Sequence, residues 1–151
     1  MTQVLNLLFR WAAALLVVYW IALFAITHVP ASGLPSQPPF PHADKVVHLV
    51  GYAVLAFVAA AAWTWRRTLG LNEYILLLAC LSCYAVLDEV SQMLPMVRRN
   101  ADVLDWAADT IGAIIGLAVF AAAAWLARRR GLRLARERRR IASEVPVVAG
   151  R

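Results

Sequence analysis

Cysteine is scarce in this chain, and Cys80 and Cys83 are the only two among 151 residues. They are three positions apart inside an apolar run, so on a helix they would share one face. No second Cys or His pair is available to complete a tetrahedral zinc set. The βαβ context of a CxxC redox motif is also missing. We therefore expect both cysteines to be small packing residues.

Motifs for cofactors and nucleophilic catalysis are equally scarce. The sequence has no glycine-rich phosphate loop, no cofactor fingerprint and no serine elbow, so we expect no cofactor. Charged residues make up only 16% of the chain, and eight of the fifteen Lys and Arg residues lie between Arg128 and Arg140. This pattern is a basic tail rather than a basic domain, so nucleic acid is not an expected partner.

Apolar residues, by contrast, are abundant. The chain is 62% hydrophobic, with a mean hydropathy of +0.67, whereas soluble domains are roughly half apolar. Four apolar stretches cover residues 8–26, 46–65, 71–94 and 103–126, and each is near the roughly 20 residues that one membrane span needs. We predict an all-α integral membrane bundle of four transmembrane helices, forming one domain over residues 1–127. The alternative for the first stretch is a signal peptide, but its apolar core is longer than usual.

The basic residues predict the orientation of these spans. Cytoplasmic loops of membrane proteins carry an excess of Lys and Arg. Arg10, the Arg66–Arg67 pair and the tail at 128–151 are therefore placed in the cytoplasm. The other two connections, 27–45 and 95–102, carry only Lys45, Arg98 and Arg99. We expect a multi-pass protein of the cytoplasmic membrane with both termini and the basic tail inside. The connection 27–45 is proline-rich, which predicts a stiff, extended strap on the outer face.

Six of the nine acidic residues fall on the predicted outer side, at the ends of three helices. Spacings of three or four residues place members of this group on shared helix faces. Charges this dense are costly in a membrane unless they pair or carry a function. The candidate catalytic residues are His48, Glu89 and Asp105. The candidate ligand-binding residues are Asp44, Lys45, Tyr52, Gln92, Arg98, Asp102 and Asp109, and no metal site is predicted.

Several of these residues allow a structural and a functional interpretation. His48 either pins two helices together through a carboxylate or acts as a general acid/base or metal ligand beside Glu89 or an aspartate. Lys45 and Arg98 (or its neighbour Arg99) either hold a phosphate or carboxylate of an envelope lipid or neutralise the aspartates around them. For the pair Gly112 and Gly116, in contrast, we expect helix packing.

Most of these polar residues lie in three elements, DKVVHLVGY, DEVSQ and DWAADTIGAIIG, with Pro95 and an arginine between the last two. In their order and spacing the chain resembles the VanZ-like family of small membrane proteins. The resemblance covers about residues 44–116, and we take the family-like region to extend to about 126. Asp109 departs from it, because the family more usually has Asn at that position.

The resemblance implies a location in the cell envelope and a link to antibiotic resistance, but no specific reaction. The family is named for a protein associated with resistance to teicoplanin, a glycopeptide that acts on the outer side of the cell membrane. We therefore expect binding or modification of an envelope component, with membrane lipids and a lipid-linked or cell-wall ligand as partners. One alternative is a membrane enzyme that acts on a lipid-linked phosphate or glycan through the His/Glu/Asp/Arg cluster. Another is a structural or assembly subunit, and the oligomeric state is left open.

Overall fold

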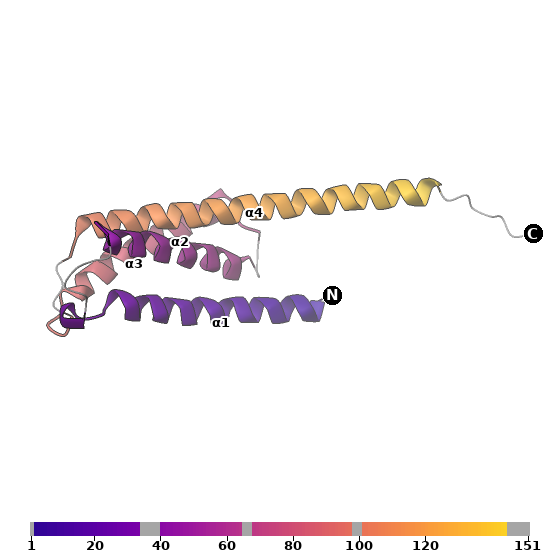
Figure 1. Cartoon of the computed structure of the whole chain (residues 1–151). Coiled ribbons are helices and arrows are strands. Elements are labelled where there is room, and N and C mark those ends of the chain that lie inside the picture. Colours follow the sequence, from indigo (N-terminus) through magenta and orange to yellow (C-terminus); the bar gives the residue numbers. More distant parts are fainter. Residues whose placement is uncertain (1, 34–39, 65–67, 98–100, 145–151) are drawn as a thin grey trace, which may run out of the picture. The chain divides into compact units, whose positions relative to one another are not determined.

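The computed structural model of the chain describes residues 2–33, 40–64, 68–97 and 101–144, with side chains from Trp11 to Ala135. It contains four α-helices and one short 3-10 turn: α1 (Thr2–Thr27), η1 (Ala31–Gly33), α2 (Ala43–Trp63), α3 (Leu71–Gln92) and α4 (Val103–Glu144) (Figure 1). The described residues include no strand, which confirms the all-α prediction. Residues 34–39 of the predicted proline strap, and the Arg66–Arg67 pair, lie outside the described residues.

Three of the helices are long and apolar enough to cross a membrane, namely α2, α3 and the Val103–Ala135 part of α4. The described apolar stretch of α1, Trp11–Thr27, is shorter. Large apolar side chains such as Leu76, Leu87 and Ile111 are exposed on these helices. Such exposure is expected where the neighbour is lipid, which is as apolar as leucine. Three of the four predicted spans are thus supported. The first predicted span, at residues 8–26 in α1, stays a prediction.

Short-range signals set the ends of the helices. At the start of α3 the Gly70 N–H donates to Glu73 Oε2 at 2.9 Å. Pro95 follows the end of α3, where the helical conformation of the preceding residue is disfavoured. At the start of α4 the Asp102 side chain accepts the Leu104 N–H at 2.9 Å, as an N-cap does. The other end of α4 lies well beyond the apolar stretch that ended near residue 126, because the helix continues through the basic run to Glu144.

The chain divides into two compact units, residues 1–120 and residues 121–151. In the second unit the guanidinium carbon of Arg129 lies 3.9 Å from the centroid of the Trp125 ring, a cation–π contact one helical turn apart. The predicted division into a membrane domain to residue 127 and a basic tail remains a prediction.

In the first unit α2 packs against all three other helices. Its small residues form a core with α3 and α4, made of Ala56, Ala59, Ala60, Leu77, Ala113 and Leu117. On the α1 side Leu23 packs against Tyr52, and the Tyr19 hydroxyl donates to the Gly51 carbonyl at 3.0 Å. The end of α1, the start of α2, the end of α3 and the start of α4 therefore meet at one end of this unit (Figure 1).

Cys80 and Cys83 are predicted to be small packing residues, but both are exposed on α3. A helix that is apolar on all sides does not reveal in its sequence which face is buried. On α3 the buried residues are Leu77, Ala85 and the polar residues near its end.

α2 and α4 approach closely at Gly112 and Gly116, which lie one turn apart on α4. A Cβ on Gly112 would overlap the carbonyl oxygen of Leu49, and a Cβ on Gly116 would overlap that of Ala53. A backbone carbonyl cannot rotate away as a side chain can. The structure thus supports the packing role that the sequence predicts for this glycine pair.

Replacement of Gly112 by alanine should lower the stability of the protein by about 1–3 kcal/mol, because the added methyl group forces α2 and α4 apart. The measurement is the thermal unfolding midpoint of detergent-solubilised protein. Gly131→Ala is the matched control, since no atom lies within 4 Å of a Cβ at this position, and alanine favours the helix. Equal midpoints for the two variants would contradict the close approach.

Candidate functional site

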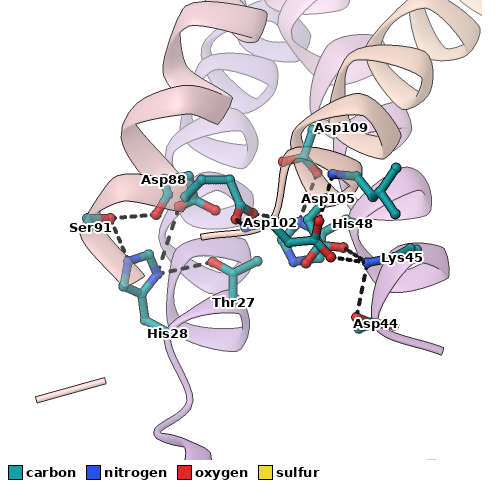
Figure 2. A network of polar contacts seen from close by, with 12 residues as sticks. Thr27, His28, Asp44, Lys45, His48, Asp88, Ser91, Asp102, Asp105 and Asp109 are labelled. Carbon is teal, nitrogen blue, oxygen red and sulfur yellow. Dashed lines mark hydrogen bonds and ion pairs between the residues drawn. The ribbon is translucent and has the colours of Figure 1, made fainter. Parts of the chain in front are cut away.

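Lys45, in the first turn of α2, is the centre of a group of ion pairs with the start of α4 (Figure 2). Its Nζ donates to Asp102 Oδ2 at 2.7 Å and to Asp105 Oδ1 at 2.8 Å, and it also reaches Asp44 Oδ2 at 3.4 Å. Asp105 is buried, whereas Asp44 is exposed. With its donors directed at carboxylates, Lys45 is placed to neutralise the aspartates around it.

Asp102 joins three helices. Its side chain caps α4 and binds Lys45 of α2, and its backbone N–H donates to Glu89 Oε2 of α3 at 3.0 Å. The hydrogen bond from Lys45, together with that from the Leu104 N–H, holds the pKa of Asp102 below its ordinary value. Asp102 is therefore a charged cap that fixes where the acidic end of α3 lies relative to α2 and α4.

His48 lies one turn further along α2, in the buried part of the cluster. Its Nδ1 is 3.0 Å from Asp109 Oδ1 on α4 and 3.7 Å from Glu89 Oε1 on α3. The three residues are only 2%, 0% and 4% exposed, respectively. The first distance is that of a hydrogen bond, whereas the second is too long for one. An imidazole from one helix thus stands between carboxylates from two others.

Some buried polar atoms of this cluster have no hydrogen-bond partner among the described residues. They are Glu89 Oε1, Asp109 Oδ2, Gln92 Nε2 and Tyr52 Oη. Such atoms are uncommon in folded proteins and call for a specific explanation. His48, Glu89 and Asp109 each offer one ligand atom, and these three atoms lie within 4.8 Å of one another. The arrangement can therefore hold a proton between acids and base, or a metal ion.

A second polar network, which the sequence did not predict, centres on His28. His28 Nε2 lies 2.8 Å from Ser91 Oγ of α3, and its Nδ1 lies 2.9 Å from the Phe24 carbonyl and 3.1 Å from Thr27 Oγ1 (Figure 2). His28 follows α1 directly, where the sequence predicted only a loop. The available signal was a histidine on the predicted outer side, close in sequence to the end of a span.

The group Ser91, His28 and Asp88 has the composition of a catalytic triad but not its geometry. His28 Nδ1 is 3.8 Å from Asp88 Oδ1, which is too long for the hydrogen bond that orients a catalytic histidine. The Ser91 hydroxyl donates to the Asp88 carbonyl within its own helix at 2.8 Å. This network therefore ties the end of α1 to the end of α3.

A groove of about 370 Å³ borders the cluster on α3 and the start of α4. Its wall is almost entirely apolar, and two acidic residues of the cluster, Glu89 and Asp102, are among the residues that line it. Trp106 in the wall is oriented by its Nε1, which donates to the Ser82 carbonyl at 3.4 Å. The lining residues are Val86, Glu89, Val90, Ala101, Asp102, Val103 and Trp106. This shape suits a ligand with an apolar chain and a polar head.

Most of the candidate residues named from the sequence lie at this one end of the helices. Lys45, Asp102 and Asp105 form the ion-pair group, and His48, Glu89 and Asp109 form the buried cluster. Asp44 is at the exposed margin. Tyr52 is fully buried, with its ring 6.2 Å from that of Tyr84, and Gln92 is also buried. Arg98, and Arg99 with it, lies outside the described residues.

Comparison with known proteins identifies the family of the chain but no individual relative. The family model described as VanZ/LLP1 matches residues 2–126. This match covers most of the chain and includes α1, which precedes the three elements that carry the resemblance. No curated protein and no solved structure matches the chain.

Replacement of Lys45 by methionine should destabilise the protein by about 3 kcal/mol, because it leaves the buried Asp105 carboxylate without its cation. The free energy of unfolding in detergent is the measurement. Asp44→Asn is the control, since it removes only an exposed contact of 3.4 Å and should change stability by at most about 0.5 kcal/mol. A Lys45→Met protein as stable as the control would show that the ion pairs contribute little.

Proposed function

The chain belongs to the VanZ/LLP1 family, and on that premise we propose that it acts at the outer face of the cytoplasmic membrane by binding an envelope component. The observation that carries the proposal is the apolar groove that Glu89 and Asp102 help to line. Glu89 belongs to both the groove and the His48 cluster. A ligand in the groove would thus bring its head to a buried histidine and carboxylates.

The chemistry of the groove favours a lipid-linked or cell-wall ligand. Its apolar wall matches an acyl or prenyl chain that is already in the membrane. Ionised carboxylates only accept hydrogen bonds, so the partly exposed side chain of Asp102 suits a head group with hydroxyl or amide donors. A lipid-linked glycan has both parts. Through such a ligand the protein would contribute to glycopeptide resistance, the theme that the resemblance implies.

The positive-inside rule supports the outer location of the cluster. The basic run from Arg128 to Arg140 follows the apolar part of α4, whereas the cluster precedes it. With four spans, both termini are cytoplasmic and the ends of the helices that carry His48, Glu89 and Asp109 face outward.

A cysteine in place of Phe40, an exposed residue just before α2, should react with a membrane-impermeant maleimide in intact cells. A cysteine in place of Arg130 should react only after the membrane is opened. Both are made with Cys80→Ser and Cys83→Ser, so that no other thiol reacts. If the Arg130→Cys protein were labelled in intact cells and the Phe40→Cys protein were not, the orientation would be the opposite of the one proposed.

A photoactivatable lipid-linked glycan should crosslink to the groove in cells that express the protein. Val90→Trp fills the groove and should lower labelling at least about tenfold, equivalent to about 1.4 kcal/mol of binding. Leu87→Trp introduces the same side chain at an exposed position that does not line the groove, and should retain labelling. Expression should also raise teicoplanin resistance, and Val90→Trp should remove that gain.

Labelling that survives His48→Ala combined with Glu89→Gln would count against the cluster as part of the binding site. Equal labelling of Val90→Trp and Leu87→Trp would count against the groove.

A second candidate function, a membrane enzyme acting on the same class of ligand, is favoured by the hydrogen bond between His48 Nδ1 and Asp109 Oδ1 at 3.0 Å. A histidine oriented by a carboxylate is suited to general acid/base catalysis. The described residues offer no serine placed as a nucleophile, so water would attack. The mass of the recovered probe separates the two functions, because binding alone returns it unchanged.

A further inference from the structure

The His48 cluster has the spacing of a metal site. Bond lengths of about 2.0–2.2 Å from a divalent ion to nitrogen and oxygen place neighbouring ligand atoms roughly 3–3.5 Å apart. His48 Nδ1 is 3.0 Å from Asp109 Oδ1 and 3.7 Å from Glu89 Oε1. These two distances are within a few tenths of an ångström of that spacing, and all three ligand atoms lie within 4.8 Å of one another.

The acidic side chains at this end of the helices outnumber the basic ones, which favours the binding of a cation. Six carboxylates gather there, and even with Arg98 and Arg99 counted from the sequence, only three Lys and Arg side chains accompany them. Among the described residues Lys45 is directed at Asp44, Asp102 and Asp105. Glu89 and Asp109 share His48 instead, and a buried charge without compensation is costly.

Two carboxylate oxygens without a hydrogen-bond partner among the described residues support a cation site independently of the spacing and the charge. Glu89 Oε1 and Asp109 Oδ2 belong to side chains that are more than nine-tenths buried, yet neither has a hydrogen-bond partner among the described residues. The other Glu89 oxygen is held by the Asp102 N–H at 3.0 Å. That hydrogen bond orients the free oxygen toward His48, so the carboxylate is aimed into the cluster.

We propose that His48, Glu89 and Asp109 bind a first-row divalent cation such as Zn²⁺ or Mn²⁺. One imidazole and two carboxylates suit these ions, whereas Mg²⁺ and Ca²⁺ prefer oxygen ligands throughout. Three protein ligands leave a coordination position open. The cation would compensate the paired carboxylates and give the site an affinity for an anionic oxygen that carboxylates alone lack. The proposal does not depend on the lipid-linked ligand, because metal binding is measured on purified protein without it.

The experiment uses full-length protein with a tag that lacks histidine, in which Cys80→Ser and Cys83→Ser exclude binding by thiols. The protein is stripped with EDTA, reloaded with Zn²⁺ or Mn²⁺, passed through a desalting column and analysed for metal by mass spectrometry. We expect one ion per chain. Glu89→Gln and Asp109→Asn keep the side-chain shape. Each should weaken metal binding, which raises the dissociation constant at least about tenfold.

His42→Ala is the matched control, because His42 is an exposed histidine just before α2; this variant should bind metal like the parent. Loading with Co²⁺ adds a measurement that needs no variant in the cluster, since ligand-field bands in the visible spectrum report bound nitrogen and oxygen ligands. A parent protein that retains no metal and shows no Co²⁺ bands would overturn the proposal. Metal retained equally by Glu89→Gln, Asp109→Asn and His42→Ala would overturn it as well.

Discussion

The structure depends on the compensation of carboxylates at one end of a set of apolar helices. An aspartate or glutamate near the membrane is stable only when a cation or several hydrogen bonds accompany it. Lys45 and Asp102 supply much of this compensation. Lys45 contacts acidic residues of α2 and α4, and Asp102 caps α4 while its N–H holds Glu89 of α3. These charged contacts therefore also determine how the three helices are positioned at that end.

The buried cluster exists only because α2 and α4 approach closely. Gly112 and Gly116 allow α4 to touch the backbone of α2 near Leu49 and Ala53. At this separation His48 reaches Asp109 directly, with 3.0 Å between Nδ1 and Oδ1. In a wider bundle the same residues would need water between them. Packing of small residues and the chemistry of the cluster are thus parts of one arrangement, and a change in the first alters the second.

Membership of the VanZ/LLP1 family and three helices that are long and apolar enough to cross a membrane agree on a membrane protein. The arrangement adds a groove beside the buried cluster, and Glu89 belongs to both. One carboxylate oxygen of Glu89 is fixed by the backbone of Asp102, and the other faces His48. Glu89 is therefore the residue through which a ligand in the groove and an ion in the cluster would influence each other.

The sequence by itself determined the helical class, most of the spans and the set of polar residues at one end, because apolar length and three- or four-residue spacing are local properties. It did not show that Lys45 pairs with Asp102 and Asp105, or that His28 meets Ser91. It also predicted Cys80 and Cys83 as packing residues, although they are exposed. Only the tertiary structure decided these points, because a helix that is apolar on every face does not encode its rotation. That rotation is selected by contacts with other helices, such as Gly112 against Leu49, which are distant in the chain.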